Sequence, residues 1–205
     1  MLFRSHDTWG QGNSAVGEAS PRIPLVIRDP RRPARGKVDQ VVRSIDLVPT
    51  LLDLANAPPA SGIDGVSLAG CLNANGACPE LDAFNETGIW IADIPGLPDT
   101  HLRYPDLLEL LEVPGRSSGT LAIKPEYNGA ILAAKDRMIR HGRWKLVYQP
   151  LVAGYELRLF DLEADPACQL DVAQQQVEMA ADLWERLRHF IGHDTREAEA
   201  PAAGQ

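Results

Sequence analysis

The sequence predicts an α/β fold: a strand and a helix, followed by a small antiparallel sheet with a packed helix. A short run rich in β-branched residues at 22–28 precedes a helical pattern at 44–56. Alternating apolar and polar residues recur within 138–161, and an amphipathic pattern lies within 172–192. A strand and a helix are therefore expected first, and an antiparallel meander with its own helix last.

The first two elements follow from local patterns. Residues 22–28, RIPLVIR, predict a buried strand, and the sequence DPRRPARG after it predicts an exposed loop. Apolar residues recur at helical spacing within 44–56. Asp46 is the expected N-cap of this helix, because Pro49 is tolerated only in a first turn, where its missing N–H would lack an intrahelical partner anyway. Pro58 should end the helix near residue 56.

The second half predicts a meander and a final helix. Three runs within 131–161, ILAAKDRMIRHG, RWKLVYQP and YELRLFDL, favour an antiparallel meander with one buried face. The segment 172–192 predicts a helix whose apolar face, from Val177 to Phe190, should pack on this sheet. These elements divide the chain into a region with a strand and a helix at 1–60, a loop-rich connection at 61–130, a small α+β subdomain at 131–192 and a disordered tail at 193–205.

Charge and composition restrict the partners. The chain has 20 Lys and Arg against 28 Asp and Glu, a net charge of −8, so its surface should repel phosphate backbones and we expect no nucleic-acid partner. No apolar run reaches the roughly 18 residues of a membrane span, which predicts no membrane segment in this chain. Cys71 and Cys78 are equally compatible with a small disulfide and with unpaired thiols, so the compartment stays open.

Taken together, four stretches resemble the sulfatases of the alkaline phosphatase superfamily. They are EASPRIPLVIRDP at 18–30, VVRSIDLVPTLLDLANAP at 41–58, MIRHGRWKLVY at 138–148 and LRLFDLEADP at 157–166. Their order and rough spacing match the family as well. The resemblance implies that 1–60 is the end of an alkaline-phosphatase-like catalytic domain and that the chain holds only the C-terminal portion of such an enzyme.

The resemblance also implies a chemistry. Sulfatases hydrolyse sulfate esters of small molecules or sugars with a divalent cation, usually calcium, and a formylglycine made from a Cys/Ser-x-Pro-x-Arg motif. No such motif occurs in this sequence. Sulfate ester cleavage needs a strong oxygen nucleophile and a cation to hold the developing charge. We therefore expect calcium and a sulfate-ester substrate in the complete enzyme, but neither turnover nor tight calcium binding by this chain alone.

Four residues are carried over as tentative site residues. His6 and Asp7 resemble a metal-binding turn of the family, although in reversed order, and the alternative is that both are ordinary polar residues near a frayed terminus. Gln11 stands where the family often has a His or Lys that contacts sulfate, and a glutamine there can hydrogen-bond but supplies no charge. Glu86, in FNETG, resembles a family string near the substrate cleft, which implies a lining role.

Other functions remain open. A phosphodiester or phosphonate ester hydrolase of the same superfamily would also transfer a tetrahedral anion, and the chain is alternatively a non-catalytic interaction module. Arg140, Arg143 and Lys145 are more typical of a solvated strand face than of an anion site. By itself, the region 22–56 should expose a contiguous apolar patch, which predicts partial unfolding or aggregation.

Overall fold

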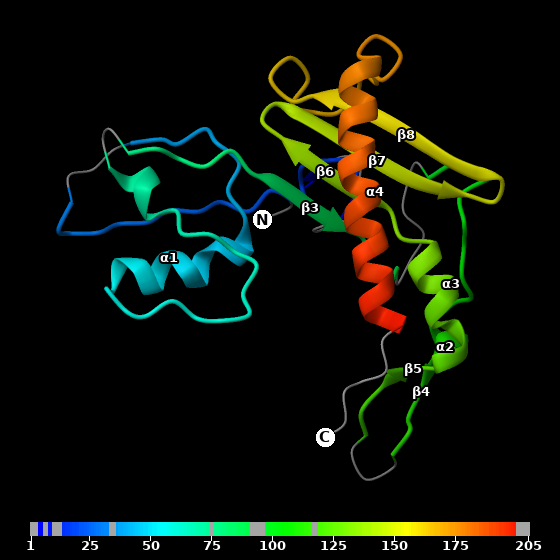
Figure 1. Cartoon of the computed structure of the whole chain (residues 1–205). Helices are drawn as coiled ribbons and strands as arrows, with labels where there is room; N and C mark the ends of the chain where they lie inside the picture. The colour runs from blue at the N-terminus through cyan, green and yellow to red at the C-terminus, as the bar shows by residue number, and fades with distance from the viewer. Residues whose placement is uncertain are drawn as a thin grey trace. The chain divides into compact units, whose positions relative to one another are not determined.

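The computed structural model is a mixed α/β structure that divides into two compact units (Figure 1). It describes residues 4–5, 8–9, 14–32, 36–73, 76–90, 97–115 and 119–199. The first unit comprises 1–22, 84–139 and 144–205, and the second comprises 23–83 and 140–143. Each unit is described by itself below.

A four-stranded antiparallel sheet is the centre of the first unit, with the strand order β3-β6-β7-β8. Its strands are β3 (Asp82–Glu86), β6 (Arg137–His141), β7 (Trp144–Leu151) and β8 (Gly154–Asp161). The last three strands form the predicted meander, and Leu146 pairs with Leu159 in the β7–β8 register. Gly142 has φ 53° in the tight turn between β6 and β7, a conformation that glycine adopts without steric cost.

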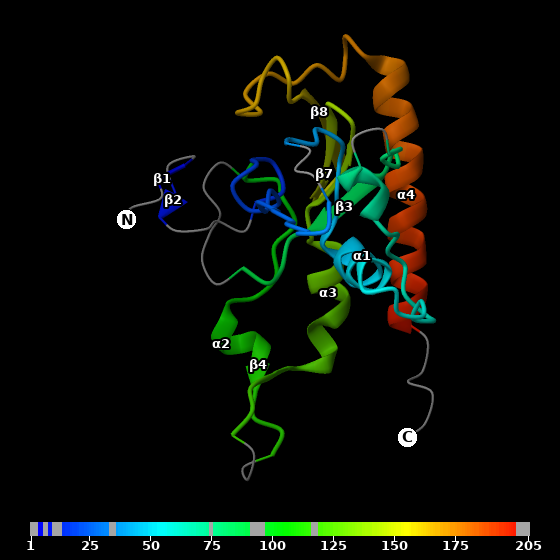
Figure 2. The ribbon, with the colours of Figure 1, turned by 90° about the vertical axis from the view of Figure 1, so that its left-hand side faces the viewer.

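One face of this sheet carries helix α4 (Val177–Glu199), as the amphipathic pattern predicts. Leu183 and Leu187 of α4 form a fully buried cluster with Ile139, Leu146 and Leu159 of the sheet. Figures 1 and 2 show the helix running across β7 and β8. The expected disordered tail from residue 193 is wrong for 193–199, where α4 continues through strong helix formers such as Ala and Glu. Residues 200–205 lie outside the described residues.

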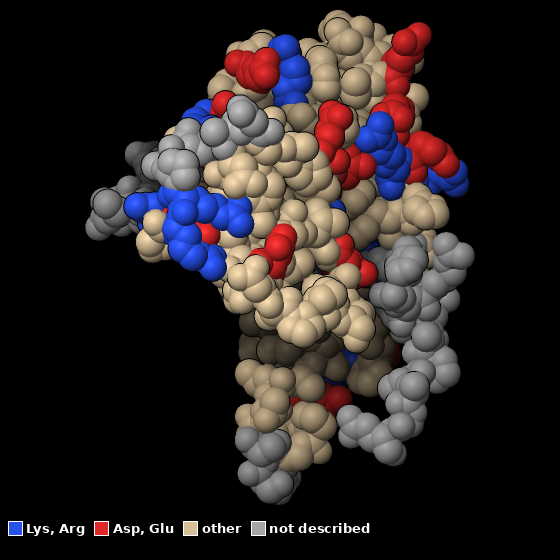
Figure 3. Space-filling model, turned by 60° about the vertical axis from the view of Figure 1, so that its left-hand side comes forward, with Lys and Arg blue, Asp and Glu red and all other residues tan. Residues whose placement is uncertain are grey.

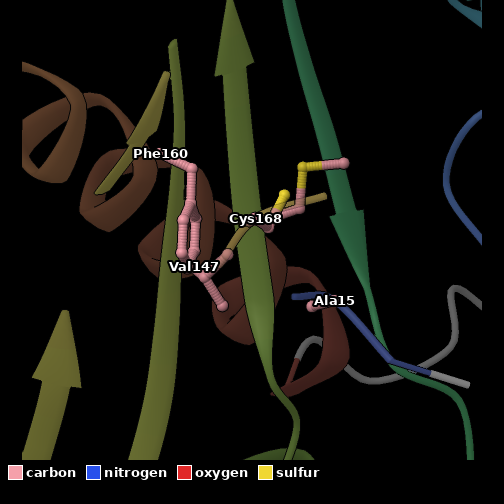
Figure 4. Close-up of a cluster of buried hydrophobic side chains, with 5 residues drawn as sticks. Ala15, Val147, Phe160 and Cys168 are labelled. Carbon is pink, nitrogen blue, oxygen red and sulfur yellow. The ribbon is translucent and has the colours of Figure 1, made fainter. Parts of the chain in front are cut away.

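The other face of the sheet is buried as well, so the prediction of one buried face is wrong. Met138, Val147 and Phe160 point to this face and pack with Ala15 and Cys168, which come from segments outside the sheet (Figure 4). Ala15, Val147 and Phe160 are fully buried. The alternation within RWKLVY therefore separates two buried layers rather than a core from solvent.

Smaller elements complete the first unit. Its short strand pairs are β1 (Arg4–Ser5) with β2 (Thr8–Trp9) and β4 (Leu111–Glu112) with β5 (Ala122–Ile123). Its short helical elements are α2 (Leu107–Leu110), the 3-10 turn η3 (Pro125–Tyr127) and α3 (Asn128–Ala133). Asp106 caps α2 by accepting from the Leu108 and Glu109 amides at 2.8 and 3.1 Å. The run that begins at residue 131 thus starts as a helix and becomes a strand at Arg137.

The second unit contains the 3-10 turn η1 (Ser44–Asp46), helix α1 (Leu47–Leu54) and the 3-10 turn η2 (Ala69–Leu72). Asp46 is at the N-cap position of α1 as predicted, but its side chain makes no cap hydrogen bond to the helix. Pro49 lies in the first turn. Asn56 ends the helix with φ 52°, and the Ala57 amide donates to the Leu52 carbonyl at 2.9 Å. Cys71 and Cys78 form a disulfide, which resolves the two alternatives left by the sequence.

The predicted buried strand at 22–28 is wrong. These residues form neither helix nor strand, and Ile23 and Val26 are 70% and 91% exposed. A strand requires a neighbouring backbone for its hydrogen bonds. None of the strands in the described part of the chain pairs with this segment.

Candidate functional site

The structure describes one of the four predicted site residues. Glu86 is the last residue of β3. His6, Asp7 and Gln11 lie outside the described residues, so their predicted roles stay predictions. Within the described ranges, no group of three or more His, Cys, Asp or Glu side chains is placed to hold a metal ion.

Glu86 lies beside two cations that follow α3. Lys135 Nζ donates to its Oε1, and Arg137 Nε lies 3.4 Å from its Oε2, which is an ion pair but not a hydrogen bond. The Glu86 side chain is 28% exposed and that of Arg137 is 4% exposed. Arg137 is held by the Leu132 carbonyl, to which its Nη2 donates at 3.0 Å. The cluster of Glu86, Lys135 and Arg137 thus has one positive charge in excess at the end of β3.

A buried polar network contains direct sequence neighbours of this cluster, Thr87 after Glu86 and Asp136 between Lys135 and Arg137. His101 Nε2 lies 2.6 Å from Asp136 Oδ1, and Gln149 Nε2 donates to Asp136 Oδ2 at 3.1 Å. The Thr87 amide donates to the Asp136 carbonyl at 2.9 Å, and the Asp136 amide donates to Thr87 Oγ1 at 3.0 Å. These four residues are at most 2% exposed. The network therefore joins the ends of β3 and β7, the segment before β6 and the loop that contains His101.

The proton positions in this network follow from the acceptors around the imidazole. His101 Nδ1 lies 2.6 Å from the Leu102 carbonyl, which can only accept, so Nδ1 carries a proton. Burial raises the pKa of the Asp136 carboxyl above its ordinary value, while the hydrogen bonds from His101 and Gln149 act in the opposite direction. The other imidazole nitrogen, His101 Nε2, faces Asp136 Oδ1. Because both side chains are buried, this pair holds its loops in place and presents no base to a substrate.

An aromatic group covers the His101 side of the network. The Trp90 ring lies 5.0 Å from the His101 ring and stacks on Tyr104 with centroids 5.4 Å apart. The Tyr104 hydroxyl accepts a hydrogen bond from the Trp90 amide, and burial raises the pKa of this phenol. The guanidinium of Arg103 lies 5.9 Å from the Trp90 centroid. These rings help to keep water away from His101 and Asp136.

A second buried ion pair lies on the same sheet face as Val147. Lys145 Nζ donates to the Gly17 carbonyl and to Glu18 Oε1, both at 2.9 Å, and Lys145 is fully buried. The prediction that Lys145 belongs to a solvated face is therefore wrong, because the segment at 14–18 covers it. Arg143 is exposed, as the prediction requires, and Arg140 is partly exposed.

The polar network was not detectable from the sequence. His101 and Asp136 are 35 residues apart, and Gln149 lies 13 residues beyond Asp136. No motif spacing connects a lone His, a lone Asp and a strand Gln. The pairing of β6 with β7 brings Asp136 close to Gln149. The imidazole of His101 comes from a turn, in which the His101 amide donates to the Pro98 carbonyl at 2.9 Å.

No protein-family model matches the chain. Among solved structures, a putative sulfatase from Bacteroides thetaiotaomicron is similar at a TM-score of 0.44 and 19% identity, over 77% of this chain and 26% of that one. A phosphonate monoester hydrolase from Silicibacter pomeroyi has a TM-score of 0.40 and 24% identity, over 75% of this chain and 25% of that one. No described helix is long and apolar enough to cross a membrane.

Sequence comparison with curated proteins finds the arylsulfatases K. The chain is 26% identical to that of Mus musculus over 176 residues, which are 86% of this chain and 26% of the relative. The identity to the proteins of Bos taurus and Homo sapiens is also 26%. The chain thus spans about a quarter of the length of these relatives. The chain is thus similar to sulfatases, and the partial coverage of these relatives fits a C-terminal portion of such an enzyme.

Proposed function

We propose that this chain is the C-terminal portion of a sulfatase-type sulfuric ester hydrolase and that it does not hydrolyse sulfate esters by itself. The similarity to arylsulfatase K over 86% of the chain supports the first part. The second part is supported by the sequence, which contains no Cys/Ser-x-Pro-x-Arg motif. Without a nucleophile of that kind, a sulfate ester has no group to attack it.

For the complete enzyme we propose a sulfate ester of a small molecule or sugar as substrate and calcium as the metal cofactor. His6 and Asp7 are the proposed calcium ligands in this chain, and Gln11 is a proposed sulfate contact. A bound calcium would supply positive charge to the transferred group. Each of these roles rests on the resemblance of the sequence to the family.

The role of Glu86 is proposed in a more specific form. Its carboxylate is negatively charged, so it repels a sulfate and cannot itself attract one. It forms ion pairs with Lys135 and Arg137. The two cations have the sign that a sulfate requires, and Glu86 fixes their positions. We propose that Glu86 contributes to the substrate cleft by holding these cations.

The proposal predicts no turnover by the isolated chain. We expect purified protein to release no product from 4-nitrocatechol sulfate above a buffer blank, measured by absorbance with and without calcium. Preparations of Lys135→Met serve as the control for contaminating hydrolases, since a contaminant's activity would be unaffected by that change. Calcium-dependent release by the original chain that Lys135→Met lowers would overturn the proposal that the chain is inactive alone.

The family assignment has its own test in the coding sequence upstream of residue 1. We expect a Cys/Ser-x-Pro-x-Arg motif there. A Thr at the nucleophile position would instead indicate a phosphodiester or phosphonate ester hydrolase. Purified chain that is monomeric, folded and indifferent to calcium, with no hydrolase sequence upstream, would favour the non-catalytic interaction module.

A further inference from the structure

Cys71 and Cys78 close a small loop in the second unit. They lie seven residues apart in the sequence, and Cys71, in η2, is 3% exposed. The third cysteine, Cys168, is a buried free thiol that packs with Val147 and Phe160 in the first unit. Burial raises the pKa of the Cys168 thiol, which disfavours the reactive thiolate. The pairing of Cys71 with Cys78 therefore has no effective competitor.

The backbone on either side of this disulfide is suited to a close approach. A Cβ on Gly76 would lie 1.9 Å from the Gly70 carbonyl oxygen, and a Cβ on Gly70 would lie 2.8 Å from the Ala77 carbonyl oxygen. A side chain at either position would push the two arms of the loop apart, since both contacts are with backbone atoms. The Cα atoms of Cys71 and Cys78 lie 4.6 Å apart, a separation that a disulfide can span. The two glycines thus let the loop bring the two cysteines together.

The crosslinked segment also joins other parts of the second unit. The Leu68 amide donates to Thr50 Oγ1 of α1 at 2.9 Å. Arg32 Nη1 donates to the Ala69 carbonyl and to Asn73 Oδ1, both at 3.0 Å. Helix α1 and Arg32 are therefore both attached to η2 and its neighbouring residues.

Apolar burial contributes little to the stability of this unit. Ile45, Val48 and Leu51 are 50%, 53% and 61% exposed. Figure 3 shows one face of the molecule, on which charged side chains form separate groups with wide uncharged areas between them. A small unit without a closed core usually needs a disulfide or a metal to be stable. Since the described part of the chain places no group of three or more His, Cys, Asp or Glu side chains for a metal ion, the disulfide is the available crosslink.

The disulfide has the features of a structural bond rather than of a site of thiol exchange. Exchange requires a thiolate to reach one of the two sulfur atoms, and exposed disulfides are the labile ones. Cys71 is buried and Cys78 is partly buried. Their spacing also differs from the Cys-x-x-Cys spacing of redox-active pairs. The bond is therefore suited to crosslinking the loop permanently.

We infer that the second unit folds stably only when the Cys71–Cys78 bond is closed, and that this protein is folded in an oxidising compartment. To form the bond, two thiols lose two electrons and two protons to a small-molecule disulfide such as oxidised glutathione, which becomes two thiols. The thiol reductants of the cytosol would keep both cysteines reduced. The inference goes beyond the proposed function and does not depend on sulfatase chemistry, so its failure would leave the family assignment intact.

The first experiment compares hydrogen exchange of the purified chain with the bond closed and after reduction by a phosphine. Reduction should lower the protection of the α1 and η2 amides at least about tenfold, because opening the loop gives the unfolded second unit more conformational freedom. Protection of the β7 and α4 amides in the first unit should not change, since Cys168 is a free thiol before and after reduction.

Cysteine variants provide the matched control. The double variant Cys71→Ser, Cys78→Ser should have low protection of α1 with or without the phosphine. Cys168→Ala should retain the full response of α1 to reduction, because it leaves the disulfide intact. If the double variant does not fold, reduction of the original chain still decides, since it opens the same bond in folded protein.

The second experiment measures closure of the bond in glutathione buffers, with remaining thiols labelled by a maleimide after denaturation and located by mass spectrometry. At the glutathione ratio of an oxidising compartment, Cys168 alone should be labelled. Gly76→Ala should need at least about tenfold more oxidised glutathione for half closure, because its Cβ would meet the Gly70 carbonyl oxygen. Gly129→Ala is the control, since a Cβ there would meet no atom within 4 Å, and it should not alter closure.

Four outcomes would overturn the inference. Labelling of all three cysteines in the oxidising buffer would mean that the bond does not form. Unchanged protection of α1 after reduction would mean that the second unit folds without it. An equal loss of protection in both units would show that the bond does not act on the second unit in particular, and equal closure in Gly76→Ala and Gly129→Ala would show that the loop is not shaped for it.

Discussion

The two units of the molecule bury their apolar side chains to very different extents. In the first unit Leu146, Leu159 and Leu183 are fully buried in one cluster between the sheet and α4. In the second unit Val48 and Leu51 of α1 are 53% and 61% exposed. Burial of apolar area is the main favourable term in folding. The first unit therefore has a hydrophobic core of its own, whereas the second depends more on specific polar contacts.

Asp46 is the main polar contact of the second unit. It is fully buried, and it accepts hydrogen bonds from Arg43 Nε at 3.0 Å and from the Val66 amide at 2.9 Å. The backbone also comes close here, since a Cβ on Gly65 would lie 2.0 Å from the Ile45 carbonyl oxygen. Thr50 Oγ1 accepts from the Leu68 amide at 2.9 Å. The string Asp64-Gly65-Val66-Ser67-Leu68 is thus fixed to α1 through backbone groups.

The largest predicted difference is between core truncations in the two units. Leu146→Ala should lower the free energy of unfolding by about 3 kcal/mol, because it leaves a cavity in a closed core. Leu51→Ala should change it by less than about 0.5 kcal/mol, since a side chain that is 61% exposed leaves no cavity and alanine favours the helix. The sequence positions of all four tryptophans fall in the first unit, so urea unfolding followed by their fluorescence measures the Leu146 effect.

Leu51→Ala must be measured by a probe of the second unit, such as hydrogen exchange of the α1 amides. A similar loss in both variants, each measured in its own unit, would contradict the comparison. It would show that the apolar face of α1 is covered in solution.

A second prediction compares two ion pairs. Lys145→Met should cost about 2 kcal/mol, because it leaves Glu18 largely buried without its cation. Lys37→Met removes the partner of Asp39 in a pair whose side chains are 81% and 76% exposed, and it should leave stability unchanged within error. Hydrogen exchange of residues 14–20 should also rise in Lys145→Met, since Lys145 holds the Gly17 carbonyl. Equal stability of the two variants would refute a structural role for the buried pair.

Local features of the fold were predictable from the sequence, whereas contacts between distant residues were not. The start of α1 was predictable, because Asp46 and Pro49 both lie within one turn of it. The burial of Lys145 was not, because its partner Glu18 is 127 residues away and the strand pattern RWKLVY has the same appearance with either face solvated. The network of His101 and Asp136 escaped prediction for the same reason.

The prediction of a strand at 22–28 was wrong for a different reason. Its composition, with β-branched residues between arginines, favours a strand. A strand also needs a neighbour, and local composition contains no information about one. The predicted strand therefore does not form, because no strand in the described chain pairs with this segment.

The smallest predicted effect is a pH dependence of opposite sign in the two units. For Asp46, burial favours the neutral acid, but hydrogen bonds from Arg43 and Val66 outweigh it and lower the pKa below the ordinary value. Its stabilising contribution is thus present above the unfolded pKa of about 3.9 and is lost as the pH falls through the folded pKa. For Asp136, burial raises the folded pKa, so its contribution is present below about pH 3.9 and is lost as the pH rises through the folded pKa.

Hydrogen-exchange protection factors between about pH 3 and pH 6, around the ordinary Asp pKa, test this difference. On acidification, protection of the α1 amides and of Val66 should fall, whereas protection around Asp136 and Gln149 should fall less or increase. Asp136→Asn should abolish the pH dependence around Gln149 and leave that of α1 unchanged, while Asp46→Asn should do the reverse. If protection in both regions has the same pH dependence in both variants, the two carboxylates do not control it. The polar contacts of Asp46 would then not be what distinguishes the second unit from the first.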